Sequence, residues 1–389
     1  MTTLEELGLL KMDFLGLRTL TVIQNAVLLA RRKQPELNIN QIDYNDQKVL
    51  DYIGTGKTDG VFQLESAGMK GFMKELKPHN LEDVIAGISL YRPGPMDFIP
   101  QYIRGKNDSS SITYDCPQLE PILAPTYGCI VYQEQVMQIV RDLAGYSLGR
   151  SDLLRRAMSK KKAAVMEKER KIFIYGDEET GVPGCIKNGI DEQTANKIYD
   201  EMIDFAKYAF NKSHAAAYAV VSYQTAWLKY YFPVEYMAAL MTSVIDNPSK
   251  VSEYIYACRQ MNIKILPPDI NKGEANFSVD GGDIRYGLAA IKSIGRPVIK
   301  AIVEDREELG LFQNLEDFIT RLSAKNVLNK RTIENLIKAG ALDTLGGTRK
   351  QFMSIYVQIV DHVTQEKKNS MVGQMTLFDL QSDSSTEKQ

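Results

Sequence analysis

A run of basic residues is the clearest candidate for phosphate chemistry in this sequence. The arginines and lysines within positions 150–162 are Arg150, Arg155, Arg156, Lys160, Lys161 and Lys162. Only Asp152 opposes them, and apolar residues such as Leu154 and Met158 give the segment a second, distinct face. Arginine offers forked donors to phosphate oxygens, and lysine supplies a point charge. On this chemistry alone, a polyphosphate site and an ordinary solvated helix face explain the run equally well.

A second polar cluster opens a predicted helix. The residues N-K-S-H, from Asn211 to His214, come directly before an apolar pattern that starts at Ala215. Free N–H groups at a helix start bind anions, and a lysine and a histidine there add donors. The alternative is ordinary capping of the helix by Asn211 or Ser213. Tyr208 and Phe210, just upstream, belong either to the core or to a surface that stacks on a base or sugar.

A lone carboxylate, Asp13, lies in the apolar string L-K-M-D-F-L-G-L. Burying a carboxylate is costly unless it is hydrogen-bonded, paired with a cation or bound to a metal. The residue types alone favour a hydrogen-bonded or capping aspartate over a metal ligand.

The string G-T-G-K-T, from Gly54 to Thr58, is similar to the end of a phosphate-binding P-loop. That loop needs a glycine where this sequence has Asp51, and it follows a hydrophobic strand. Because a carboxylate would face the phosphate, we predict an ordinary loop instead.

Composition bounds the class of protein. The 389 residues are 44% hydrophobic and 25% charged, with a formal net charge of -2, so we expect a globular chain of about two or three domains. Four cysteines without a C-x-x-C pair, and only three histidines, argue against structural zinc and predict free thiols. The longest uncharged stretch, 213–228, is too short and too polar for a membrane span, so we expect a cytoplasmic protein without a membrane partner.

The elements that must position these residues are mostly helical, with small β elements. Apolar residues recur at helical spacing in 134–143, 192–208, 215–231 and 235–245. Two short strands are predicted at 277–279 and 284–286, followed by two units of helix–hairpin–helix type at 287–306 and 332–348. From residue 365 the composition is polar and typical of a disordered or linker segment.

Ten short strings then follow one another in a recognisable order. They are K-M-D-F-L-G-L-R-T-L-T, V-F-Q-L-E-S, R-P-G-P, Y-Q-E-Q-V-M, L-R-R-A-M-S-K-K-K, F-N-K-S-H-A-A-A-Y, S-Y-Q-T-A-W-L-K, I-L-P-P-D-I-N, Y-G-L-A-A-I-K-S-I-G and L-I-K-A-G-A-L-D. Together they resemble the alpha subunits of bacterial DNA polymerase III, which are C-family replicative DNA polymerases, over about residues 9–378. Ser159 departs from the family pattern, which has glycine there, and this puts only the local loop geometry in doubt.

The resemblance implies that residues 1–44 form the C-terminal end of a polymerase palm. In that family three aspartates hold two magnesium ions, which activate the primer 3′-hydroxyl and neutralise the leaving pyrophosphate. Asp13 matches the third aspartate, and Lys11 is expected to contact the incoming triphosphate from the same face of a strand. The Asp-x-Asp pair that supplies the other two occurs nowhere in this sequence, so this fragment alone is expected to be inactive.

The resemblance also implies that residues 45–269 form the fingers, which bind the deoxynucleoside triphosphate. The residues expected to face the nucleotide are Lys11, Arg155, Arg156, Lys160, Lys161, Tyr208, Lys212 and His214. Arg92 in R-P-G-P and Gln133 in Y-Q-E-Q are expected to have structural or template-side roles, which the sequence does not separate.

Residues 270–364 are expected to form a tandem helix–hairpin–helix region that holds the primer–template duplex through its phosphates, without reading sequence. The residues implied are Lys292, Gly295, Arg296, Lys330, Arg331 and Gly340, the glycines letting backbone N–H groups approach phosphates closely. In the polar tail, 365–389, the residues Gln374, Leu377 and Phe378 fit the family's Q-x-x-L-F peptide for the sliding clamp. Other subunits of the replicase holoenzyme are the remaining expected partners.

A different class of function stays open at this point. The same residues are compatible with a non-catalytic module that binds DNA and the sliding clamp and is encoded as its own chain. An Asp-x-Asp pair in frame upstream would favour the polymerase, whereas a promoter and ribosome site directly before Met1 would favour the module.

Overall fold

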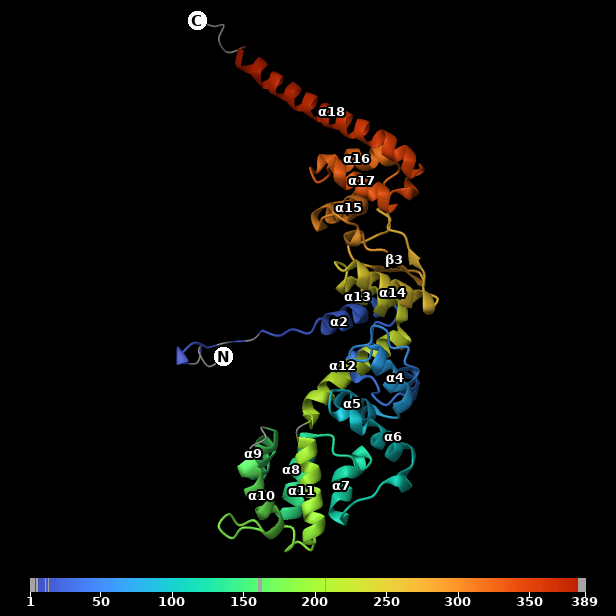
Figure 1. Ribbon diagram of the computed structural model, residues 1–389. Coiled ribbons are helices and arrows are strands. Elements are labelled where there is room, and N and C mark those ends of the chain that lie inside the picture. The colour runs from blue at the N-terminus through green and yellow to red at the C-terminus, as the bar shows by residue number, and fades with distance from the viewer. Residues whose placement is uncertain are drawn as a thin grey trace. The chain divides into compact units, whose positions relative to one another are not determined.

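The computed structural model describes residues 4, 6–10, 12, 14–159, 163–206 and 208–383, and their side chains except at 159, 163, 206 and 368–383. The described chain is mostly helical with one small sheet, which confirms the predicted fold class (Figure 1). It divides into two compact units: Asn38–Tyr230, and Met1–Leu37 together with Tyr231–Gln389. We call these the central unit and the outer unit.

The central unit is a succession of helices joined by short loops. They are α3 (Gln47–Gly54), α4 (Ala67–Leu76), α5 (Leu81–Leu90), α6 (Ile99–Asn107), α7 (Glu120–Leu123), α8 (Gln133–Ala144), α9 (Leu148–Ser159), α10 (Ala163–Tyr175), α11 (Glu192–Ala206) and α12 (Lys212–Tyr231). Asp46, Ser66 and Asn80 cap α3, α4 and α5 by accepting hydrogen bonds from backbone N–H groups of the first turn. The G-T-G-K-T string is the end of α3 and the loop after it, as predicted.

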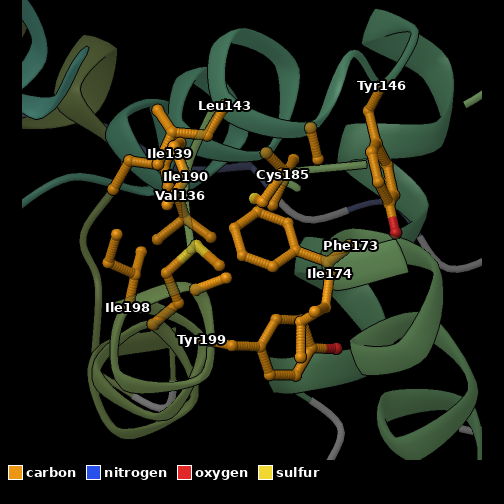
Figure 2. Packing of buried hydrophobic residues seen from close by; sticks show 14 of the residues in the cluster. Val136, Ile139, Leu143, Tyr146, Phe173, Ile174, Cys185, Ile190, Ile198 and Tyr199 are labelled. Atoms are coloured by element: carbon orange, nitrogen blue, oxygen red, sulfur yellow. The ribbon is translucent and has the colours of Figure 1, made fainter. Parts of the chain in front are cut away.

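Two hydrophobic cores hold the central unit together. The first gathers α8, α9, α10 and α11 around residues such as Leu143, Phe173 and Tyr199, as Figure 2 shows. The second joins α3, α4 and α5 to α12, which buries Tyr223 completely. The helices that carry the basic run and the N-K-S-H cluster are therefore both anchored by buried apolar faces.

The outer unit combines helices with a three-stranded sheet. Its helices are α2 (Arg18–Ala30), α13 (Pro233–Ser243), α14 (Pro248–Gln260), α15 (Arg296–Leu309), α16 (Leu315–Ala324), α17 (Lys330–Ala339) and α18 (Arg349–Asp383). The strands are β1 (Ile265–Leu266), β2 (Ser278–Asp280) and β3 (Asp283–Arg285), in the order β1-β3-β2. β1 pairs with β3 in parallel, and β2 pairs with β3 antiparallel. The two short strands predicted between 277 and 286 are confirmed.

The boundary between the two units, at Tyr230, differs from residue 269, the expected end of the fingers. α12 ends at Tyr231, and Pro233, which lacks a backbone N–H, starts α13 as a separate helix. α13 packs on α2 and against the sheet, so that it belongs to the outer unit.

The expectation of a linker from residue 365 is wrong for the backbone up to residue 383. α18 continues as one helix from Arg349 to Asp383, a span that contains no proline. Its first half packs on the outer unit through Phe352 and Tyr356, and the helix propagates from there because each further residue adds one backbone hydrogen bond.

The four cysteines are free, as predicted, and all four are buried. Burial raises the pKa of Cys129 and of Cys185 to about 12, so both thiols stay protonated at neutral pH. Nowhere in the described ranges do three His, Cys, Asp or Glu side chains gather closely enough to hold a metal ion. Among the helices described, none is both long and apolar enough to cross a membrane.

Candidate functional site

A short backbone pairing brings two distant motifs together in the central unit. Tyr132 and Phe210 form an isolated parallel β-bridge. The N–H of Phe210 donates to the carbonyl of Val131 at 3.1 Å, and the N–H of Gln133 donates to the carbonyl of Phe210 at 2.9 Å. The start of α8 is thus fixed against the segment that leads into α12.

Side chains of the protein accept hydrogen bonds from backbone N–H groups at the start of α12. The N–H of His214 donates to the side-chain oxygen of Asn211 at 2.8 Å, so Asn211 caps the helix, as one of the two interpretations held. The N–H of Lys212 donates to both carboxylate oxygens of Glu134, at 3.0 and 3.2 Å. The Lys212 ammonium pairs with Glu82 at 3.0 Å and lies 5.2 Å from the ring centre of Tyr132.

Aromatic rings line the surface beside this helix start. The ring of His214 lies between those of Phe210 and Tyr218, with centroid distances of 5.5 and 4.4 Å. The guanidinium of Arg92, in R-P-G-P, lies 4.5 Å from the centre of the Phe210 ring, which is within cation–π range. The histidine therefore belongs to an aromatic row rather than standing alone.

Tyr208 packs directly on the R-P-G-P loop. Gly94 has φ +101°, a conformation that side chains rarely adopt, and a Cβ built on it would lie 2.4 Å from Cδ1 of Tyr208. This close approach is what requires glycine at the position. Tyr208 itself remains 46% exposed.

The basic run lies mainly on α9, where its two neighbouring arginines differ. Arg155 is 18% exposed; its Nε and Nη2 donate to Asp152 at 3.0 and 2.7 Å, and its Nη1 donates to Gln133 at 3.0 Å. Arg156 is 62% exposed and contacts the other oxygen of Asp152 at 2.8 Å. The hydrogen bond from Arg155 is the main cause that lowers the pKa of Asp152.

The structure thus gathers four of the recognised motifs on the central unit: R-P-G-P, Y-Q-E-Q, L-R-R-A-M and F-N-K-S-H. Of the expected nucleotide-binding residues, Arg155 is linked through Gln133 to the segment that leads into α12, which contains Tyr208, Lys212 and His214. Arg156 is the neighbour of Arg155 on α9, whereas Lys160 and Lys161 lie outside the described residues. Arg150, which also belongs to the basic run, forms an ion pair with Glu169 at 3.1 Å and lies over the ring of Tyr146.

Two residues in this arrangement were missed from the sequence: Gly94 and Glu134 as fixed partners of the aromatic and basic groups. Asp152 was identified there only as the charge that opposes the basic run. A glycine between two prolines was the one local signal, because such a residue often marks a special turn. Nothing local indicated that Glu134 would meet the start of α12.

The hairpins of the outer unit present a second set of candidate residues. Lys292 and Arg296 are exposed on either side of Gly295, which precedes α15 with an ordinary φ of -81°. Gly340 ends α17 with φ +82°, where a Cβ would lie 2.1 Å from the guanidinium of Arg349. A left-handed conformation therefore requires glycine at 340 but not at 295.

The lysine and arginine at the start of α17 differ in their surroundings. Lys330 is paired with Asp361 of α18 at 2.7 Å, whereas Arg331 is exposed to solvent. An exposed ion pair of this kind contributes little to stability.

Two groups of expected site residues lie outside the description, either entirely or by their side chains. Lys11 and Asp13 lie outside the described residues. Gln374, Leu377 and Phe378 fall within the backbone of α18, but their side chains lie outside the description.

Comparison with known proteins gives two family matches. Residues 19–181 match the bacterial DNA polymerase III alpha subunit finger domain, and residues 262–352 match a helix-hairpin-helix motif. The DNA polymerase III subunit alpha of Thermus aquaticus is 48% identical over 384 residues, which cover 97% of this chain and 31% of that protein. That of Escherichia coli (strain K12) is 46% identical over 387 residues, covering 96% and 33%, and that of Bacillus subtilis (strain 168) is 44% identical over 363 residues, covering 93% and 32%. The chain spans about a third of the length of these relatives.

Proposed function

Because this chain belongs to the family of bacterial DNA polymerase III alpha subunits, of which it spans about a third, we propose that it is part of a DNA-directed DNA polymerase. Its central unit would bind the incoming deoxynucleoside triphosphate. Its outer unit would hold the primer–template duplex behind the active site.

The observation that carries the nucleotide-binding proposal is the convergence of basic and aromatic side chains on the central unit. Arg156 exposes its guanidinium next to Arg155 on α9. Gln133 links Arg155 to the segment around Phe210, which has Tyr208 just before it and leads to Lys212 and His214. Guanidinium groups neutralise phosphate charge through forked hydrogen bonds, and exposed aromatic faces stack on a base or sugar. Lys160 and Lys161, which follow these arginines in the sequence, would also contact the triphosphate.

Magnesium belongs to this proposal through Asp13 alone. In the family setting the metal ions supply charge neutralisation and activation of the attacking hydroxyl. Among the described residues no group of three His, Cys, Asp or Glu side chains could hold such an ion. Lys11 would contact the triphosphate.

The outer unit supports duplex and clamp binding in different ways. Exposed Arg296 and Arg331 lie in the first turns of α15 and α17, and exposed Lys292 lies in the turn before α15, where cations and backbone N–H groups can meet phosphates. Gln374, Leu377 and Phe378 match the family's clamp peptide by sequence. The sliding clamp and other replicase subunits are therefore proposed partners of the complete polymerase.

The test is steady-state incorporation kinetics with the complete polymerase subunit. Replacing Arg156 with methionine removes the charge and keeps the aliphatic stem. Losing a charge-assisted phosphate contact should cost roughly 1.5–3 kcal/mol, seen as a higher nucleotide KM or slower incorporation, with little change in primer–template affinity. Unchanged nucleotide dependence together with weaker DNA binding would reassign this surface to the duplex.

A further inference from the structure

We infer that Gln133 is a positioning residue, which locks Arg155 of α9 to the segment that opens α12 and so sets the spacing of the nucleotide site. This inference rests on the proposed function. Nothing in the sequence separates a structural from a template-side role for this glutamine; its contacts give it a third one.

Both ends of the Gln133 amide are engaged, each with a different part of the central unit. Its Oε1 accepts from Nη1 of Arg155 at 3.0 Å, and its Nε2 donates to the carbonyl of Ala209 at 3.1 Å. Its backbone N–H adds the bond to Phe210 at 2.9 Å. One half-buried residue at the start of α8 therefore ties α9 to the approach of α12.

Asp152, the other hydrogen-bond partner of Arg155, cannot link α9 to the segment before α12. Asp152 lies three residues away on the same helix, so its bonds orient the guanidinium only relative to α9. Among the hydrogen bonds that the structure describes for Arg155, the one to Gln133 is the one that leaves its own helix. It fixes the distance between the arginine and the residues beyond the Tyr132–Phe210 bridge.

Fixing a flexible cation before the ligand arrives has a direct effect on binding. An arginine side chain has many rotamers, and ordering them on binding lowers affinity. Since Arg155 is already held by three hydrogen bonds, a phosphate that meets its remaining N–H groups would find them in place. Arg156, which is 62% exposed and bound to Asp152 of its own helix, has more freedom.

The two ends of the amide can be separated by substitution. Gln133→Met keeps the length and shape of the side chain and removes both hydrogen bonds. Gln133→Glu keeps an acceptor for Arg155, removes the donor to Ala209 and adds a negative charge beside Glu134. If the bridge is what matters, both variants are impaired, although only one of them loses its bond to the arginine.

The experiment measures nucleotide KM, kcat, primer–template Kd and Tm in the complete polymerase subunit. Gln133→Met and Gln133→Glu are expected to raise KM by about threefold to tenfold, as for the loss of one or two hydrogen bonds that orient a ligand group. Primer–template Kd should stay within about twofold. In a double-mutant cycle with Arg155→Met, the effects on KM should be clearly less than additive, because both changes break the same contact.

Two glutamines on the same helix serve as matched controls. Gln138 is exposed, so Gln138→Met should change neither KM nor Tm. Gln135 is buried and bonds to backbone groups of Val131, Tyr132 and Ile122, so Gln135→Met should lower Tm while leaving KM unchanged. A purely structural role for Gln133 would give the Gln135 pattern instead of the one expected.

The possible results separate the positioning role of Gln133 from the proposed nucleotide site on which it rests. If Arg156→Met raises KM and Gln133→Met does not, the positioning role is overturned and the nucleotide site stands. If neither arginine variant changes KM, the nucleotide site fails and the positioning role fails with it.

Discussion

Replacing Gly94 with alanine should disturb the candidate site through the backbone. Gly94 precedes a short 3-10 turn, Pro95–Phe98, with φ +101° and ψ -69°. That combination lies outside the left-handed region that residues with a side chain can adopt. Alanine there must either strain the chain or change the course of the R-P-G-P loop.

The expected magnitude has two parts. Holding alanine in a sparsely populated backbone conformation costs about 1–3 kcal/mol. The new methyl would also lie 2.4 Å from Cδ1 of Tyr208, so the ring must leave the loop and lose part of its contact, which we take as about 1 kcal/mol. The free energy of unfolding of the central unit should therefore fall by roughly 2–4 kcal/mol.

The assay exploits the single tryptophan of the chain. Trp227 lies on α12, inside the central unit, so its fluorescence during urea unfolding reports on that unit. A loss of this size should move the urea midpoint down by roughly 1 M or more. Because Tyr208 belongs to the proposed nucleotide surface, nucleotide KM of the complete polymerase should rise as well.

A cycle with Tyr208→Ala isolates the ring contact. In that background the methyl has no ring to displace, so Gly94→Ala should cost about 1 kcal/mol less than in the parent chain. Gly71→Ala is the matched control: Gly71 is exposed inside α4, with nothing within 4 Å of a built Cβ, and alanine there should stabilise by about 0.5–1 kcal/mol. Refutation would come from a Gly94→Ala chain whose unfolding free energy lies within about 0.5 kcal/mol of the parent.

Three further outcomes test the other parts of the proposal. The chain alone should not extend a primer, because Asp13 matches just one of the family's three metal-binding aspartates. Robust template-dependent extension that Asp13→Ala abolishes would contradict this expectation. The chain should bind duplex DNA without sequence preference. In fluorescence anisotropy, Lys292→Ala and Arg296→Ala should each reduce the slope of log affinity against log salt concentration by about 1. Salt-insensitive or base-specific binding would count against a helix–hairpin–helix role. Changing Leu377 and Phe378 together to alanine should abolish binding to immobilised sliding clamp in surface plasmon resonance and leave Tm nearly unchanged. The reason is that the two side chains would contribute roughly 3–6 kcal/mol to the clamp interface. Retained clamp binding with a lower Tm would instead identify the two residues as a structural anchor.

The sequence by itself determined the local elements of this protein. Apolar spacing located α8, α11, α12 and α13 to within a few residues, and Asn211 was recognised as a possible cap. These features depend on hydrogen bonds and side chains within one or two turns, so short stretches of sequence contain the information. The order of ten motifs was likewise sufficient to identify the family, because each string could be matched without knowing where it folds.

Which residues meet was decided by the tertiary structure alone. The pairing of Tyr132 with Phe210 and the bond from Arg155 to Gln133 join segments that are far apart in the chain, and they form because separate hydrophobic cores fix α8, α9 and α12. Tertiary packing also gave adjacent Arg155 and Arg156 different exposures and set Tyr208 on Gly94, and in the outer unit it placed α13 with α2. Such contacts depend on the complementary shapes of surfaces assembled from many segments, and a side chain's neighbours in sequence carry no record of them.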